Sequence, residues 1–374
     1  MTASERCKAP GKKKLLALDG GGIRGALTIE VLAGIESMLR TEYKNDRLVL
    51  SDYFDYIGGT STGAILAAAL ATGMSTDALR KFYEESGPAM FKKSSILRRF
   101  RYRYEDDALA LQLQKIFGKD TTLGSDSLRT LLLLVMRNAT TDSPWPLSNH
   151  PSAKFNNTGN DGDNLKLPLW QLIRASTAAP VYFPPEIVSV GAHDFLFVDG
   201  GVTMHNNPAF QLFLMATTQP FRCNWRAEEK KMLLVSVGTG HAPDANRDLG
   251  ASQMNLLYNA SSVPSALMAA ALHEQDALCR YFGRCLVGEP IDLELGDMKD
   301  LPAPNGQKLF TYMRYNAELS RRGLDQLGLR DVQPKAVQRL DSIEAIDDLQ
   351  RVGRAVAAQV ERVHYAGFLD ATES

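Results

Sequence analysis

A serine in a glycine-bordered turn is the first candidate for chemistry in this chain of 374 residues. Residues 56–71 read YIGGTSTGAILAAALA, where Gly59, Ser61 and Gly63 form a G-x-S-x-G pattern between an apolar run and a helix-forming segment. In that context the pattern predicts a nucleophile elbow, a tight strand–helix turn that exposes the serine hydroxyl. Glycines at 59 and 63 allow the helix to start close against the strand. An ordinary tight turn with an incidental serine fits as well, so Ser61 needs partners elsewhere.

The Ser61 hydroxyl needs a base, because a serine hydroxyl is a weak nucleophile on its own. Histidine, held by a carboxylate, is the usual base. The chain has six histidines, His150, His193, His205, His241, His273 and His364. His205 is the best candidate because it lies close to Asp199 in the sequence. His273 and His364 have the chain order of an α/β-hydrolase, but neither lies in a glycine-bordered loop after a strand.

Asp199 offers a base of a different kind. A carboxylate within hydrogen-bond distance of a serine can take its proton directly. Asp199 follows the apolar run 195–198 and precedes Gly200 and Gly201, which let other backbone pass close to it. An aspartate before two glycines is also common in ordinary turns. A Ser61–Asp199 dyad and a triad with histidine are therefore the two hypotheses.

A glycine-rich loop, DGGGIRG at residues 19–25, supplies the remaining requirement for acyl transfer. Gly20, Gly21 and Gly22 can turn several N–H groups towards one point, as an oxyanion hole requires. Arg24 adds positive charge or fixes the loop. The same glycines fit the G-x-G-x-x-G pattern of dinucleotide-binding proteins, but that pattern needs an acidic residue after the next strand, where this chain has Ser61.

Short apolar runs alternate with helical patterns, and the clearest are residues 14–18, 131–138, 195–198 and 232–237. This alternation predicts an α/β fold with a mostly parallel central sheet and helices on both faces. Ligands bind beyond the C-terminal ends of the strands in such sheets. Because the glycine loop, Ser61 and Asp199 each follow an apolar run, we expect them to converge if their strands are neighbours.

Three segments depart from this alternation. Residues 1–13 are predicted to be a disordered basic lead-in, and residues 142–163, rich in Ser, Asn, Gly, Asp and Pro, a long surface loop. Residues 91–104, FKKSSILRRFRYRY, interleave basic and aromatic side chains, as do segments that bind lipid headgroups or nucleic acid. We favour the simpler interpretation, in which these charges pair with the acids at 105–107.

Composition and charge restrict the class of protein. The formal net charge is −1, which predicts no long-range attraction to nucleic acid. Cys7, Cys223, Cys279 and Cys285 have no metal-ligand spacing, so we expect no metal site and a reducing cytosol. No apolar run is long enough to span a bilayer and no signal peptide is readable. The expected location is cytoplasmic, with peripheral contact to a membrane.

These residues carry a resemblance to the patatin-like phospholipase family. The loop D-G-G-G-x-R-G at 19–25, G-T-S-T-G at 59–63 and D-G-G at 199–201 resemble three motifs of that family, in its order. The segment 175–185, ASTAAPVYFPP, is similar to one that those proteins carry before the aspartate. The likeness runs from about residue 14 to 240, with a softer stretch at 310–329.

The resemblance implies a three-layer patatin-like fold and a lipid acyl hydrolase that cleaves glycerophospholipid esters. Ser61 would be the nucleophile, Asp199 the base and the glycine loop the oxyanion hole. It implies no cofactor and no calcium requirement. The catalytic domain would cover residues 14–374, with a core at about 14–240 and a largely helical part at about 250–374.

Membrane phospholipid is the partner that the resemblance implies, and a homo-oligomer stays open. Some similar bacterial proteins are antiphage defence effectors that act on membrane phospholipid after binding a cyclic oligonucleotide. The chain length and its helical C-terminal third are compatible with that regulation. They are equally compatible with a constitutive lipase or carboxylesterase acting on other esters. A non-catalytic binding module would be expected to lack one dyad residue, and both are present.

Overall fold

The computed structural model describes residues 2–90, 106–180, 182–243, 256–303 and 306–369. Within them, one sheet contains the strands β1 (Lys13–Leu18), β2 (Tyr56–Thr60), β3 (Leu131–Asn138), β4 (Ser143–Ser148), β5 (Glu186–Val190), β6 (His193–Asp199), β7 (Met232–Val237), β8 (Arg284–Val287) and β9 (Thr311–Tyr315). Their order is β5-β6-β3-β2-β1-β7-β9-β8, and β4 pairs with β3.

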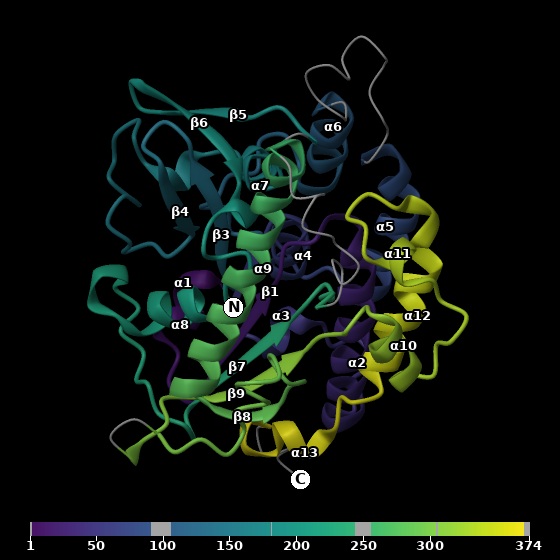
Figure 1. The fold of residues 1–374 in the computed structure, drawn as a ribbon. Coiled ribbons are helices and arrows are strands. Elements are labelled where there is room, and N and C mark those ends of the chain that lie inside the picture. Colours follow the sequence, from purple (N-terminus) through teal and green to yellow (C-terminus); the bar gives the residue numbers. More distant parts are fainter. Residues whose placement is uncertain (1, 91–105, 181, 244–255, 304–305, 370–374) are drawn as a thin grey trace.

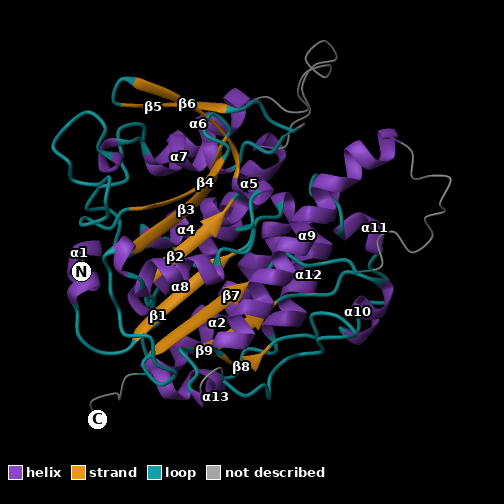
Figure 2. Ribbon diagram, turned by 60° about the vertical axis from the view of Figure 1, so that its left-hand side comes forward, coloured by secondary structure: helices purple, strands orange, loops and turns teal. Residues whose placement is uncertain are grey.

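The sheet is mostly parallel, as the sequence predicts. Strands β3, β2, β1, β7, β9 and β8 run parallel, whereas β4, β5 and β6 join antiparallel. Helices lie on both faces of the sheet, so the molecule has three layers (Figures 1 and 2). The expected α/β three-layer sandwich is confirmed.

Strands β2 and β6 meet end to end along one edge of β3. The first five residues of β3 pair with β2, up to Thr60 opposite Val135. The next three pair with β6, beginning with Asp199 opposite Met136. Since β4 occupies the other edge of β3, β2 and β6 share the same edge and approach each other with their C-terminal ends. This pairing brings the residues after β2 next to Asp199.

The helices are α1 (Ala3–Lys8), α2 (Gly25–Tyr43), α3 (Leu50–Tyr53), α4 (Thr62–Ala71), α5 (Thr76–Met90), α6 (Asp106–Phe117), α7 (Leu169–Ser176), α8 (Ala209–Thr217), α9 (Leu256–Phe282), α10 (Arg321–Gln326), α11 (Pro334–Val337), α12 (Ile346–Ala357) and α13 (Arg362–Tyr365). Single turns of 3-10 helix follow β1, as η1 (Gly22–Arg24), and β6, as η4 (Gly200–Val202). In the described part of the chain, no helix has the length and apolar character needed to cross a membrane.

The core lies on the two faces of the sheet. Leu16 and Leu18 of β1 pack into the cluster that includes α2, α4, α7 and α12. Leu15 and Ala17 point to the opposite face, where α8 and the end of α9 cover them. All four are fully buried, as expected for a parallel strand between two helical layers.

The N-terminal segment differs from the predicted disordered lead-in, because residues 3–8 form helix α1. Thr2 and Glu5 form a capping box at its start. The basic side chains bind carbonyl groups: Arg6 Nε donates to the Arg129 oxygen at 2.9 Å, and Lys13 Nζ donates to the Ala9 oxygen at 2.6 Å. These contacts hold the N-terminal segment against the rest of the protein, although its basic composition is typical of a solvated tail.

One other expectation needs correction, and a second needs an addition. The predicted surface loop 142–163 contains strand β4, whose Pro144 and Pro146 are tolerated because β4 pairs with β3 along one side only. The C-terminal part contains helices α9 to α13, as expected, and in addition two short strands, β8 and β9, that extend the sheet beyond β7. The basic and aromatic segment 91–104 lies outside the described residues.

Candidate active site

Ser61 lies at the turn between β2 and α4, in the strained geometry that an elbow requires. Its backbone has φ 56° and ψ −123°, which is costly for a residue with a side chain. A Cβ on Gly59 would lie 1.9 Å from the Gly63 carbonyl oxygen, and one on Gly63 would lie 2.2 Å from that of Leu18. Both glycines are therefore needed for the close contact of backbones around Ser61.

The structure brings Ser61 and Asp199 into direct contact. The Ser61 hydroxyl donates to Asp199 Oδ2 at 2.6 Å. The other carboxylate oxygen, Oδ1, accepts from the Gly201 N–H at 2.6 Å. A Cβ on Gly200 would lie 2.3 Å from the Val135 carbonyl oxygen, so this glycine is required for β6 to end beside β3. The Gly201 N–H thus holds Oδ1 of the carboxylate, and Oδ2 is the oxygen that accepts from the Ser61 hydroxyl.

Ser176 is a residue of this site that carried no role in the sequence analysis. Its hydroxyl accepts from the Ser61 N–H at 3.0 Å and donates to the Val135 carbonyl oxygen at 2.6 Å. It therefore connects the elbow to β3 and holds the Ser61 backbone. Ser176 belongs to the ASTAAP segment at 175–180, which resembles a segment of the family, but that resemblance did not indicate a contact with Ser61.

Burial changes the acid strength of Asp199. Removal from water disfavours its charged form and raises the pKa of the carboxyl group to about 6, against the opposing effects of the Ser61 hydroxyl, the Gly201 N–H and the Arg174 charge. At pH 7 most of the group is still ionised. A carboxylate with a pKa close to neutrality is a better proton acceptor than an ordinary aspartate.

The glycine loop lies directly against the elbow. A Cβ on Gly20 would approach Asn206 Oδ1 to 2.3 Å and the Ser61 Cβ to 3.2 Å, and one on Gly21 would lie 2.2 Å from Thr239 Oγ1. Gly22 has a φ of +58°, which favours glycine. The three glycines are therefore required by crowding at the first two positions and by backbone conformation at the third.

The three loop N–H groups are not equivalent. Gly20 N–H donates to the Asn206 carbonyl oxygen at 3.0 Å, and the Gly20 carbonyl accepts from Thr239 Oγ1 at 2.9 Å. The expectation that Gly20 contributes an oxyanion donor is thereby corrected, because its N–H is already engaged. No acceptor in the described part of the chain receives the N–H of Gly21 or Gly22.

Arg24 carries a positive charge next to the glycine loop. Its Nε atom is buried and has no hydrogen-bond partner among the residues that the structure describes. Burial lowers the pKa of its guanidinium to about 10, an effect that the nearby Asp19 charge opposes. Arg24 therefore remains cationic at neutral pH.

An ion pair beneath the loop was not found from the sequence. Asp19 directly follows β1 and accepts two hydrogen bonds from Arg314 of β9, at 2.9 and 2.5 Å. Both side chains are buried, with 2% and 5% exposed. Arg314 also donates to Ser236 on the strand between them. Strands β1 and β9 lie far apart in the chain, and in the sheet only β7 separates them, so the pair is revealed by the sheet order and not by the sequence.

His205, the histidine favoured by the sequence, is not the hydrogen-bond partner of the Ser61 hydroxyl. Thr60 Oγ1 donates to the backbone oxygen of His205 at 2.6 Å, which fixes that loop beside β2. The imidazole itself is buried, and burial lowers its pKa to about 4. The partner of the Ser61 hydroxyl is Asp199. In the described part of the chain, the Ser61 hydroxyl is therefore bonded to Asp199 and has no hydrogen bond to the His205 imidazole.

The chain belongs to the patatin-like phospholipase family. The model of this family matches residues 16–213, a little over half of the chain, and this range includes the glycine loop, Ser61 and Asp199. Patatin-15 of Solanum tuberosum is 30% identical over 256 residues, which cover 64% of this chain and 63% of that protein. Patatin group J-1 of the same plant is 31% identical over 243 residues, 60% of each chain.

Among solved structures, human GIVD cytosolic phospholipase A2 resembles this chain with a TM-score of 0.50 and 13% identity, covering 98% of this chain and 61% of that one. At this identity the likeness concerns the fold alone. The chain spans less than two thirds of the length of the patatins named above. The activity, substrate and partners of the whole protein therefore enter below as proposals.

Proposed function

We propose that this protein is a lipid acyl hydrolase of the phospholipase A type, which cleaves glycerophospholipid esters through a Ser61–Asp199 dyad. The observation that carries the proposal is the 2.6 Å hydrogen bond from Ser61 Oγ to Asp199 Oδ2 at a strained elbow. Membership of the patatin-like phospholipase family supports the substrate class.

The reaction proceeds through an acyl-enzyme. Ser61 Oγ attacks the ester carbonyl carbon while Asp199 takes the hydroxyl proton. The tetrahedral intermediate collapses, and the proton on Asp199 passes to the departing lysolipid or alcohol. Water then attacks the acyl-Ser61 ester, with Asp199 again as the base, and releases the fatty acid and the free serine. Each proton gained by Asp199 is returned in the same half-reaction.

The N–H groups of Gly21 and Gly22 are the donors proposed for the developing oxyanion. They have no acceptor among the described residues, and the loop lies against the Ser61 side chain. Donors that are already aimed stabilise the intermediate without reorganisation at the moment of reaction. Gly20 positions the loop through Asn206, and Arg24 supplies positive charge beside it.

Labelling with a fluorophosphonate tests the nucleophile, and hydrolysis of phosphatidylcholine vesicles tests the reaction. Wild type should become labelled and release fatty acid, and Ser61→Ala should do neither. Asp199→Asn should lose hydrolysis. If Ser61→Ala and Asp199→Asn both leave ester hydrolysis intact, the dyad is wrong. Ser37→Ala, a substitution in the exposed part of α2, serves as the matched control because it leaves the site untouched.

Two alternatives give different results in the same preparations. A dinucleotide-binding protein that used the glycine loop would show saturable binding of NAD or NADP, and we expect a flat titration. A constitutive carboxylesterase would hydrolyse short-chain esters and leave phospholipid vesicles intact. A comparison of both ester classes at matched enzyme concentration decides between these assignments.

Activation by a cyclic oligonucleotide is a separate hypothesis about regulation of the same dyad. It predicts low hydrolysis of phospholipid by the purified protein and a strong increase with one member of a cyclic oligonucleotide panel. Constitutive activity predicts equal rates across the panel. Fluorophosphonate labelling of Ser61 with and without each compound shows whether low activity arises because the serine is inaccessible or because the assay lacks the natural substrate.

A further inference from the structure

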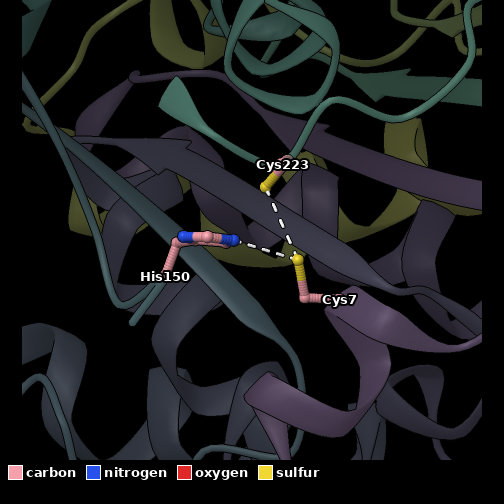
Figure 3. A group of neighbouring side chains, drawn as sticks. All are labelled: Cys7, His150 and Cys223. Atoms are coloured by element: carbon pink, nitrogen blue, oxygen red, sulfur yellow. Dashed lines mark hydrogen bonds between the residues drawn. The ribbon is translucent and has the colours of Figure 1, made fainter. Parts of the chain in front are cut away.

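A group of three side chains lies apart from Ser61 and contributes nothing to the proposed reaction. Figure 3 shows Cys7 of α1, His150 after β4 and Cys223 after α8 pointing towards one another. Cys7 Sγ lies 3.0 Å from His150 Nε2 and 4.0 Å from Cys223 Sγ. The three ligand atoms lie within 4.8 Å of one another.

We propose that Cys7, His150 and Cys223 form a binding site for one thiophilic metal ion, with Zn²⁺ as the expected occupant. Zinc is bound by cysteine sulfur at about 2.3 Å and histidine nitrogen at about 2.0–2.1 Å, usually in a tetrahedron. Those lengths place two sulfurs about 3.8 Å apart and a sulfur and a nitrogen about 3.6 Å apart. The Cys7–Cys223 separation of 4.0 Å is close to the first value, the Cys7–His150 separation of 3.0 Å is shorter than the second by about 0.6 Å, and the Cys223–His150 separation is within 4.8 Å, so small side-chain movements would complete the site.

A disulfide fits the geometry less well. The sulfur–sulfur distance in a disulfide is about 2.05 Å, roughly half of the separation found between Cys7 and Cys223. The imidazole of His150 also lies closer to Cys7 than Cys223 does. A disulfide would involve only the two sulfur atoms, whereas a metal ion would also be bound by the His150 nitrogen.

The backbone around each ligand is held by other contacts. The Trp225 indole N–H donates to the Cys7 carbonyl oxygen at 2.9 Å. Asn156 Nδ2 donates to the His150 carbonyl oxygen at 2.8 Å, and His150 is buried. Two thiolates and a neutral imidazole would balance the charge of a divalent ion. Three protein ligands leave a fourth position for water.

One contact of His150 must change when metal binds. The Ser152 N–H donates to His150 Nδ1 at 3.1 Å, so a neutral ring carries its proton on Nε2, which faces Cys7. Coordination through Nε2 requires the proton to move to Nδ1 and breaks the contact with Ser152. The proposal therefore predicts a change of tautomer, which nitrogen-detected NMR of the histidine ring can follow.

The site lies at the N-terminal ends of the parallel strands. Tyr56, the first residue of β2, packs edge to face against Trp225 and donates to Ser148, two residues before His150. Cys7 precedes β1, whose first residue, Lys13, donates to the Arg6 carbonyl oxygen of α1 at 3.0 Å. Metal would connect α1 to two loops on the edge remote from Ser61. We therefore expect a structural ion that stabilises the fold.

Zinc binding to the full-length, reduced protein tests the proposal. Titration against a chromophoric chelator should give one Zn²⁺ per chain, and bound zinc should raise the melting temperature by several degrees. Co²⁺ should give the visible absorption of a thiolate-ligated ion. Cys223→Ser should weaken Zn²⁺ binding at least about 100-fold, since one thiolate is lost. Cys285→Ser, which replaces a buried thiol outside the cluster, should bind zinc like wild type.

Alkylation of the unmutated protein gives a second measurement that does not depend on a variant folding. Bound Zn²⁺ should protect Cys7 and Cys223 from iodoacetamide, and chelation should restore their labelling. Failure of wild type to retain one equivalent of zinc would overturn the proposal. So would unchanged zinc affinity in Cys223→Ser, or an intact mass lower by two hydrogens with both cysteines resistant to alkylation after chelation, which would identify a disulfide.

Discussion

Ser61 and Asp199 lie at the C-terminal ends of β2 and β6, whereas Cys7, His150 and Cys223 lie near the N-terminal ends of the parallel strands. In both groups, side chains in direct contact lie more than a hundred residues apart in the chain. Around Ser61, the glycines and the strained backbone leave a residue pattern in the sequence. The cysteine–histidine group has no such pattern, because its ligands occupy an ordinary helix and two loops.

This contrast shows what each end of the sheet requires of the chain. An elbow and an oxyanion loop need particular backbone conformations, which restrict several adjacent positions to glycine. Three converging ligands need only side chains of the right chemistry on a rigid frame. If the two proposals hold, changes near Ser61 should lower activity and leave the fold intact, and changes at the cysteine–histidine group should lower stability and leave the reaction intact.

The largest effect is expected from Ser61→Ala. Loss of the nucleophile should lower kcat/KM for phospholipid by about 10⁴-fold or more, as for the nucleophile of other serine hydrolases. The zinc affinity of the other end should be unchanged. Steady-state hydrolysis and a zinc titration on the same preparation check both statements, and a residual activity within tenfold of wild type would contradict the role of Ser61.

Arg314→Met should give the next largest effect, on stability. Asp19 would be left buried without its partner, which costs about 3–5 kcal/mol of the free energy of unfolding. Arg322→Met is the control, because Arg322 is 61% exposed and its pairing with Glu318 contributes at most about 1 kcal/mol. Urea unfolding measures both. Equal destabilisation by the two substitutions would show that burial of the Asp19–Arg314 pair has no special effect.

Asp199→Asn should make the protein more stable while it abolishes hydrolysis. The pKa of about 6 lies above the ordinary value of 3.8, so ionisation of Asp199 in the folded state costs about 3 kcal/mol at pH 7 to 8. This cost is absent below pH 3.8 and develops as the pH rises to 6. Thermal unfolding of both forms at pH 8 and pH 4 should show the gain at pH 8 only.

The rate should follow the ionisation of the same carboxyl group. Because only the charged form of Asp199 accepts the serine proton, kcat/KM should be constant well above pH 6 and fall about tenfold per unit below it. A profile from pH 5 to 9 with a water-soluble ester avoids changes in the vesicles. An inflection near pH 7.5 or higher would instead indicate that another group acts as the base.

Removal of zinc should have the smallest effect on catalysis and a clear effect on stability. A chelator added to zinc-loaded protein should lower the melting temperature by several degrees, while kcat/KM at 25 °C changes less than about twofold. Differential scanning calorimetry and the ester assay measure the two quantities. Equal loss of both would place the metal in the reaction and remove the distinction between the two ends of the sheet.

Much of the arrangement around Ser61 could be predicted from residue patterns. The alternation of apolar runs and helices predicted the sheet and its layers, and the glycines around Ser61 predicted a tight turn. Arg314, Ser176 and the engagement of Gly20 N–H with Asn206 were not predictable, because each depends on a contact between distant segments. Helix α1 was missed because Arg6 and Lys13 look solvated until their carbonyl partners are known.

The sequence by itself determined the fold class, the glycine-bordered turn at Ser61 and Asp199 as one of the candidate partners of that serine. Local backbone constraints are written into neighbouring residues, so they can be read without coordinates. Only the tertiary structure decided that β6 meets β2 end to end on β3, which brings the Ser61 hydroxyl to Asp199. It alone brought Cys7, His150 and Cys223 together, since strand order and helix docking set distances that no local spacing encodes.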